Sequence, residues 1–256
     1  MHHIISDVQW EACDLSEFDC GAGVCIPAYK QCNLVVDCPD GAEHSDEDKD
    51  FCGSLPEELM CSFENTMCGW HNTKNRKCGR PNVGNSTRLA WIHHKGFVNT
   101  NLPGFKWLDC AVLESSTYIQ PSAQVFDSSS PYLNMCKVRF FLRKSSTPLK
   151  LVMNTFCDEG STVLAHFNDT INYWENIVVP LKDPKGSFNL QWIVTSTRYS
   201  PFHKLDIQIT NISLSVECFS IQEKAVGGNI TTDKGTCDTL PTTLPLSDTT
   251  QENQGE

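Results

Sequence analysis

The sequence predicts a mainly β protein in which a small cysteine-rich module precedes a larger all-β domain. Six of the fourteen cysteines fall between Cys13 and Cys52, where aliphatic residues are few. From Cys61 onward, aromatic and β-branched segments alternate with turn residues, and no helical period covers most of the stretch. The first part is too small to fold around a hydrophobic core alone. We therefore expect disulfides or a metal to hold it together.

Changes in composition divide the chain into four parts. We expect the cysteine-rich module at residues 11–53, and a short linker containing Pro56 at 54–60. The all-β domain is expected at 61–218. The remaining residues, 219–256, are rich in Thr and Pro and predict a disordered stalk or linker.

The cysteine density indicates a protein that folds outside the cytosol, where disulfides persist. Four N-glycosylation sequons agree with this, at Asn85, Asn168, Asn211 and Asn229. The first residues lack the features of a secretory signal, so we expect a fragment or a mispredicted start. No stretch approaches the roughly 18 to 20 apolar residues that span a bilayer. We expect a secreted protein or an ectodomain whose anchor lies outside this sequence.

The formal charge of −11 is concentrated in the first module. Residues 11–52 hold eleven acids against two lysines, Lys30 and Lys49. Such a block repels phosphate backbones, which argues against a nucleic-acid partner. Acids this dense repel one another unless a hard divalent cation neutralises them, and calcium is the simplest such ion. The alternative is a disulfide knot with solvated surface acids and no metal.

Alternating residues predict strands in the all-β domain. Val138, Phe140 and Leu142 alternate with charged residues, and the same pattern covers 188–194, as in half-buried strands. Apolar residues are odd-numbered in 205–209 but even-numbered in 212–216, which predicts a β-bulge near Thr210 and Asn211. Most tryptophans are expected in the core: Trp70, Trp91, Trp107, Trp174 and Trp192.

The cysteines of the module enclose a specific set of motifs: Phe18, Cys25-Ile26-Pro27, Asp37-Cys38-Pro39-Asp40-Gly41 and Ser45-Asp46-Glu47. With these motifs the module resembles the LDL-receptor class A repeat. The resemblance implies three disulfides, Cys13 with Cys25, Cys20 with Cys38, and Cys32 with Cys52. It also implies one calcium ion, held by the side chains of Asn33, Asp37, Asp46 and Glu47 and by the backbone carbonyls of Lys30 and Val35.

Two departures from the family pattern affect the calcium site. Asn33 stands where an acid is usual, which supplies a neutral oxygen and lowers the expected affinity. The acidic loop is also longer than in the family, so either Asp46 and Glu47 are the ligands and three residues bulge out, or Glu43 and His44 take their places. We favour Asp46 and Glu47, because calcium prefers oxygen to imidazole.

A third departure concerns ligand recognition. Members of the family often bind a partner's lysine against the calcium-site carboxylates and an aromatic residue, and Lys30 stands at that aromatic position. A cation there repels an incoming ammonium group, although the adjacent Tyr29 could provide an aromatic surface.

Cys61-Ser62-Phe63-Glu64-Asn65-Thr66-Met67-Cys68-Gly69-Trp70 opens the larger domain, and further matching segments follow in order as far as Cys218. This domain resembles the MAM domain, an extracellular adhesion module with a jelly-roll-like β-sandwich. The resemblance implies the disulfides Cys61 with Cys68 and Cys136 with Cys218. It leaves open the pairing of Cys78, Cys110, Cys157 and Cys237. The sequon at Asn211 suggests that the last strand's edge faces solvent.

No catalytic motif is found: the sequence has no Gly-x-Ser-x-Gly, no His-Glu-x-x-His and no phosphate-binding Gly-rich loop followed by Lys-Ser/Thr. We therefore expect a non-catalytic, calcium-stabilised pair of modules for adhesion or interaction with extracellular proteins. One alternative is a fragment of an endocytic ligand receptor, which Lys30 and the single class A repeat disfavour. Another is an accessory ectodomain of a receptor kinase or secreted protease.

Overall fold

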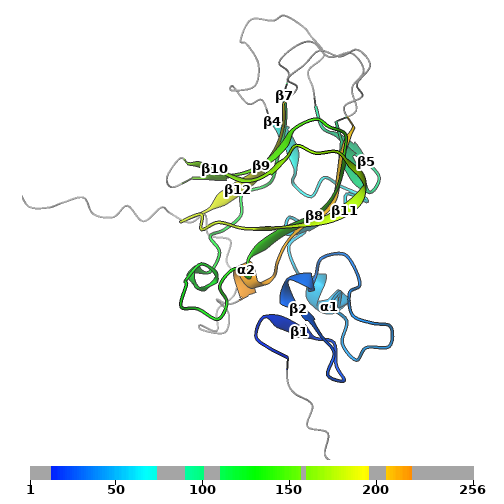
Figure 1. Cartoon of the computed structure of the whole chain (residues 1–256), viewed down its shortest axis with the longest axis vertical. Helices are drawn as coiled ribbons and strands as arrows, with labels where there is room; N and C mark the ends of the chain where they lie inside the picture. The colour runs from blue at the N-terminus through cyan, green and yellow to red at the C-terminus, as the bar shows by residue number, and fades with distance from the viewer. Residues whose placement is uncertain (1–12, 74–89, 101–109, 157–159, 196–205, 221–256) are drawn as a thin grey trace, which may run out of the picture.

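The computed structural model describes residues 13–73, 90–100, 110–156, 160–195 and 206–220. In these ranges the chain forms a small disulfide-rich module and, next to it, a sandwich of two antiparallel β-sheets (Figure 1). The predicted fold class, mainly β with a small stapled module before a β-sandwich, is confirmed. No helix among the described residues is long and apolar enough to cross a membrane.

The module contains little regular structure. It consists of the antiparallel pair β1 (Glu17–Asp19) and β2 (Cys25–Pro27), the 3-10 turn η1 (Ala28–Lys30) and the short helix α1 (Lys49–Cys52). Its main core cluster has only Cys20, Ile26 and Cys38 as buried members. So few apolar contacts cannot hold a fold in place, and covalent links take over that role. The module's disulfides are those that the class A resemblance implies: Cys13–Cys25, Cys20–Cys38 and Cys32–Cys52.

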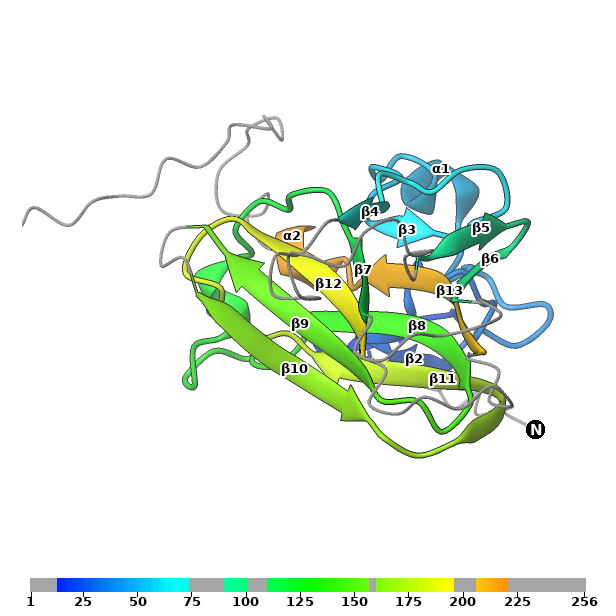
Figure 2. The same ribbon diagram turned by 90° about the horizontal axis from the view of Figure 1, so that it is seen from above.

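The sandwich packs a five-stranded sheet against a six-stranded one (Figure 2). The five-stranded sheet has the order β10-β9-β12-β7-β4, with bounds Ser161–Phe167, Leu149–Thr155, Phe188–Thr195, Cys110–Glu114 and His71–Thr73. The other sheet has the order β11-β8-β13-β6-β5, with bounds Ile171–Pro180, Lys137–Lys144, Ile207–Leu214, Phe97–Asn99 and Ile92–His94. The sixth strand of this second sheet is β3 (Met60–Cys61), which pairs with β13 outside that order. The 3-10 turn η2 (Ala123–Val125) and the short helix α2 (Glu217–Ser220) complete the fold.

The predicted alternation places the core between the sheets. Val138, Phe140 and Leu142 of β8 are buried and face the apolar residues of β12. Phe140 meets Trp192 edge to face, with ring centroids 4.6 Å apart. Such aromatic pairs contribute beyond the area they bury, so this contact joins the two sheets at the centre of the core.

Of the four predicted core tryptophans that lie in the described residues, three are buried and one is not. Trp70, Trp91 and Trp192 are buried, whereas Trp174 is 41% exposed. The register of β11 against β8 shifts between Ile171 and Glu175, so the local alternation no longer places Trp174 in the core. Its ring lies instead beneath Arg143, 5.8 Å from the guanidinium carbon. Trp107 lies outside the described residues.

The predicted β-bulge in the last strand is confirmed. The register of β13 against β8 shifts between Thr210 and Ser213, and Asn211 has φ of +48°, a conformation that Asn tolerates better than most residues. The expectation that this edge faces solvent is wrong, because β13 pairs with β8 on one side and with β6 and β3 on the other. The sequon residue Asn211 is half-buried in this central strand, while Asn168 is exposed. Asn85 and Asn229 lie outside the described residues.

The segment expected to be a linker is packed between the module and the sandwich. Leu55 and Met60 pack around Val216 and the buried Cys32–Cys52 disulfide, and β3 at the end of the segment pairs with β13. Residues 54–60 therefore dock the module onto the sandwich instead of only spacing it. At the other boundary, Phe219 packs against the sandwich core, whereas we expected the tail to begin there. The rest of the tail, residues 221–256, lies outside the described residues.

Disulfides close the sandwich near its two chain ends. Cys61–Cys68 and Cys136–Cys218 are the pairs that the MAM resemblance implies. Cys110 is disulfide-bonded as well. Cys78, Cys157 and Cys237 lie outside the described residues.

Candidate calcium site

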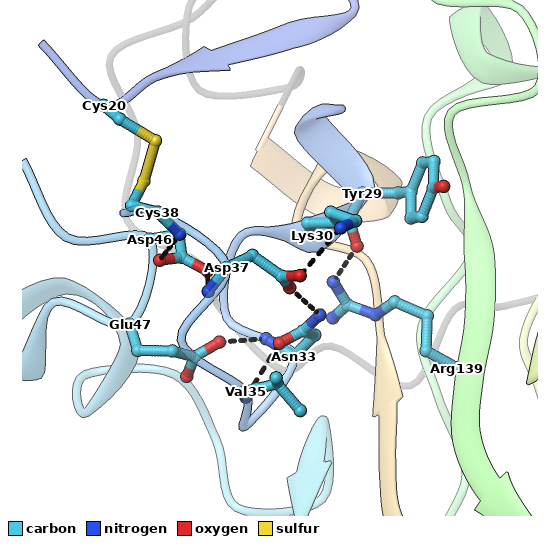
Figure 3. A network of polar contacts seen from close by, with 10 residues as sticks. All are labelled: Cys20, Tyr29, Lys30, Asn33, Val35, Asp37, Cys38, Asp46, Glu47 and Arg139. Atoms are coloured by element: carbon cyan, nitrogen blue, oxygen red, sulfur yellow. Dashed lines mark hydrogen bonds and ion pairs between the residues drawn. A yellow bond between two sulfur atoms is a disulfide. The ribbon is translucent and has the colours of Figure 1, made fainter. Parts of the chain in front are cut away.

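Asp46 lies at the centre of a polar network in the module. It is completely buried, and its two carboxylate oxygens accept hydrogen bonds from the backbone amides of Asp37, at 2.9 Å, and Cys38, at 3.0 Å (Figure 3). A buried carboxylate is destabilised unless hydrogen bonds or a cation compensate for lost hydration. The two amides supply part of that compensation, and they hold the acidic loop against the segment before Cys38.

Glu47 makes the second connection between the acidic loop and this segment. Its Oε1 accepts hydrogen bonds from the backbone amides of Asn33 and Leu34, the second at 2.9 Å. Burial raises the pKa of Glu47, while the two amide hydrogen bonds oppose that shift. Burial therefore disfavours the charged form of this half-buried carboxylate.

Asp37 and Asn33 complete the side chains of the predicted set. The Oδ2 of Asp37 accepts the Asn33 side-chain amide at 2.8 Å, and its Oδ1 lies 2.7 Å from the ammonium group of Lys30. The Oδ1 of Asn33 accepts the backbone amide of Val35 at 2.8 Å. Lys30 and Val35, whose carbonyls the resemblance also assigns to calcium, lie on either side of Asn33 in the same segment.

The structure places Asp46 and Glu47, and not Glu43 and His44, against the Asn33–Cys38 segment. The ring of His44 lies 3.2 Å from the carbonyl oxygen of Asp19, and the side chain of Glu43 packs against Gly21. Both residues therefore lie beside the turn after β1. Which of the two pairs binds calcium stays a prediction, and the position of Asp46 and Glu47 is compatible with the alignment in which three residues bulge out.

The donor set fits a hard divalent cation. Its side chains offer three carboxylates and one amide oxygen, the ligand types that calcium prefers. Within the described ranges, neither Asp46 nor Glu47 forms a salt bridge with a lysine or arginine, and the direct hydrogen bonds to both carboxylates come from backbone amides. The ammonium group of Lys30 occupies an oxygen of Asp37 that such a cation would use. Among the described residues, the only three His, Cys, Asp or Glu side chains whose ligand atoms all lie within 4.8 Å of one another are Cys13, Glu17 and Cys25, and this group is unsuitable because both its cysteines are disulfide-bonded.

Arg139 of the sandwich reaches the same segment, which the sequence did not predict. From β8 its Nη1 donates to the carbonyls of Tyr29 and Gln31, the latter at 2.8 Å. Its Nη2 donates to Cys32, at 2.9 Å, and to Leu214 of β13, at 2.8 Å. The alternation of β8 predicted a solvent-facing side chain, but Arg139 is only 2% exposed because the module covers that face. This burial lowers its pKa to about 10.

Residues 11–52 match the family model of the low-density lipoprotein receptor domain class A. These residues form a class A domain, a non-catalytic binding module, and its disulfides are those of an extracellular protein.

Among solved structures, a family 29 carbohydrate-binding module has 9% sequence identity and a TM-score of 0.37, covering 61% of this chain and 86% of that module. A mutant of such a module also has 9% identity, with a TM-score of 0.36, covering 62% of this chain and 89% of the mutant. The β-sandwich assignment rests on the two sheets themselves.

Proposed function

We propose that the chain is a non-catalytic extracellular binding segment in which calcium stabilises the class A module and a MAM-type sandwich carries the module. The observation that carries the proposal is the network of Asp46 and Glu47. Two acids from a distant loop are held by backbone amides against the Asn33–Cys38 segment, which itself carries the oxygen donors Asn33 and Asp37. Calcium, when bound, would supply the positive charge that the carboxylates lack.

The disulfides of the sandwich support its assignment as a MAM domain. Cys61–Cys68 and Cys136–Cys218 match the pairs of that family, and the second pair joins positions 82 residues apart. Such a sandwich with a docked class A module favours adhesion or binding of extracellular proteins. The ion pair of Lys30 with Asp37 argues against capture of lysine-presenting ligands, because an ammonium group of the chain itself already occupies one carboxylate.

Calcium titration calorimetry of the whole oxidised chain tests the metal part of the proposal. We expect one calcium ion per chain. Asp46→Asn removes the buried charge with little change in shape and is expected to weaken binding strongly, whereas the exposed Glu43→Gln is the matched control and is expected to bind like wild type. No uptake by wild type, or a larger effect of Glu43→Gln, would contradict the assignment.

Bead aggregation and cell-surface binding test the adhesion part. Beads coated with the chain are expected to bind one another or to bind cells in calcium, and to lose that binding in a chelator. Beads coated with the Asp46→Asn chain serve as the control. Absence of both kinds of binding in calcium would argue against an adhesive function.

A further inference from the structure

The contact between Arg139 and the module has an unusual form. One guanidinium group from the sandwich binds three consecutive or near-consecutive carbonyls of the module, those of Tyr29, Gln31 and Cys32, together with Leu214 of its own sheet. The planar fork of arginine suits such multiple bonding, which a lysine ammonium could not reproduce with the same geometry. The side chain is almost completely buried, so solvent does not compete for these bonds.

The carbonyls that Arg139 binds belong to the backbone of the candidate calcium site. The Tyr29 and Gln31 peptides flank Lys30, whose carbonyl is assigned to calcium, and Cys32 directly precedes Asn33. The same segment is closed from the other side by the amide hydrogen bonds to Glu47 and Asp46. Arg139 therefore fixes one side of a loop whose other side carries the acids (Figure 3).

We propose that Arg139 couples calcium binding in the class A module to docking of that module on the sandwich. Arg139 holds the 29–33 backbone in the ligand-presenting conformation, so less ordering remains for the ion to impose. By the reciprocity of linkage, a bound ion strengthens the docking by the same factor. Arg139 is a positioning residue here and not a calcium ligand. The inference rests on the proposed calcium site.

The positive charge of Arg139 is expected to weaken calcium binding, whereas its hydrogen bonds to the loop are expected to strengthen it. An experiment must separate these two effects. A guanidinium group near the site repels a divalent cation, although the buried Glu217 offsets part of its field. If repulsion dominated, removing the charge would tighten calcium binding. If positioning dominates, any change that breaks the fork weakens binding, whether or not the charge remains.

Two variants and one control distinguish these cases in calcium titrations of the whole chain. Arg139→Gln removes both charge and fork, and Arg139→Lys keeps the charge but loses the fork. We expect both to bind calcium tenfold to a hundredfold more weakly than wild type, the range found for residues that orient metal ligands. Arg143→Gln is the matched control, because Arg143 lies on the same face of β8 and pairs with Asp206 of the sandwich. Its calcium affinity is expected to be unchanged.

Hydrogen exchange measured by mass spectrometry tests the reciprocal effect, that calcium binding strengthens docking of the module on the sandwich. In wild type, calcium is expected to slow exchange both in residues 29–35 of the module and in residues 212–218 of the sandwich. In Arg139→Lys the slowing in 212–218 is expected to disappear while that in 29–35 persists at saturating calcium. Intact near-ultraviolet circular dichroism of each variant confirms that its sandwich is folded.

The outcomes separate this inference from the proposed function. If wild type takes up no calcium, the calcium site fails and the coupling fails with it. If wild type binds calcium but both Arg139 variants bind it equally well, or Arg139→Gln binds it more tightly, the coupling alone is overturned. Calcium protection in 212–218 that survives in both variants would overturn it as well.

Discussion

The ammonium group of Lys30 lies 2.7 Å from Oδ1 of Asp37, so the module neutralises one of its own candidate calcium ligands. The hydrogen bond to Asp37 raises the pKa of Lys30, and the lysine therefore stays charged throughout the physiological range. An intramolecular cation in this position competes with calcium and with any basic group that a partner presents.

Replacing Lys30 by Trp is expected to improve capture of a lysine-presenting peptide by the calcium-loaded chain. The change removes a repulsion of about 1 kcal/mol near the surface and adds a cation–π surface that contributes roughly 0.5 to 2 kcal/mol. Together these favour at least about tenfold tighter binding. Surface plasmon resonance measures it, with the exposed Lys49→Trp as control. Tight binding by wild type with no gain in Lys30→Trp would restore the receptor hypothesis.

Truncation of the central aromatic pair is expected to destabilise the sandwich strongly. Trp192 is fully buried against Phe140, so Trp192→Ala should lower the free energy of unfolding by about 3 to 5 kcal/mol. Trp174→Ala removes the same side chain from the surface, and its effect should stay below about 1 kcal/mol. Urea unfolding followed by circular dichroism compares them. Equal losses would show that the core is not centred on Trp192.

The two described disulfides of the sandwich are expected to differ in their contribution to stability. Cys136–Cys218 closes a sequence separation of 82 residues and Cys61–Cys68 one of 7. Loop-closure entropy assigns them about 4.5 and about 2.5 kcal/mol, respectively. Urea midpoints of the two double-alanine variants should follow that order. The reverse order would mean that native contacts around Cys61 outweigh the entropy of the unfolded chain.

Burial raises the pKa of Glu217, which lies near Arg139 at the interface. A carboxyl group with a raised folded-state pKa binds protons more readily in the folded protein, so its contribution to stability falls as pH rises from its unfolded value of about 4.3. We expect Glu217→Gln to gain stability relative to wild type between pH 4 and pH 7. Thermal unfolding at several pH values measures this, with the exposed Glu175→Gln as control. A constant difference between Glu217→Gln and wild type would contradict it.

The sequence predicted features that depend on local pattern. Alternation in β8 and β12 identified the core strands, and a change in the parity of apolar residues located the bulge at Asn211. Features that depend on contacts between distant segments were not predicted. Strand alternation says on which face Arg139 lies, but not that a module with its own disulfides covers that face. Pro56 indicated a break in regular structure, and nothing nearby in sequence indicated that Leu55 would pack against the cluster of Val216 and the Cys32–Cys52 disulfide.

The acidic network was predictable in its members but not in its hydrogen bonds. Spacing and family resemblance pointed to Asp46 and Glu47 without excluding Glu43 and His44. Only the folded loop shows which pair reaches the backbone amides of Asn33 and Asp37. The competing ammonium group of Lys30 was recognised as a charge, while its pairing with Asp37 required the geometry of η1.

The pairing of β3 with β13 determines where the chain enters and leaves the sandwich. Met60 lies opposite Ser213, and α2 follows β13 directly, so the entry and exit points are neighbours at the pole where the class A module sits (Figure 1). The chain therefore enters and leaves the sandwich at the same end, and the rest of the sandwich lies to one side of the path between these two points. It leaves α2 beside the class A module, and tension between the module and α2 would pass along β3 and β13 without crossing the rest of the sandwich.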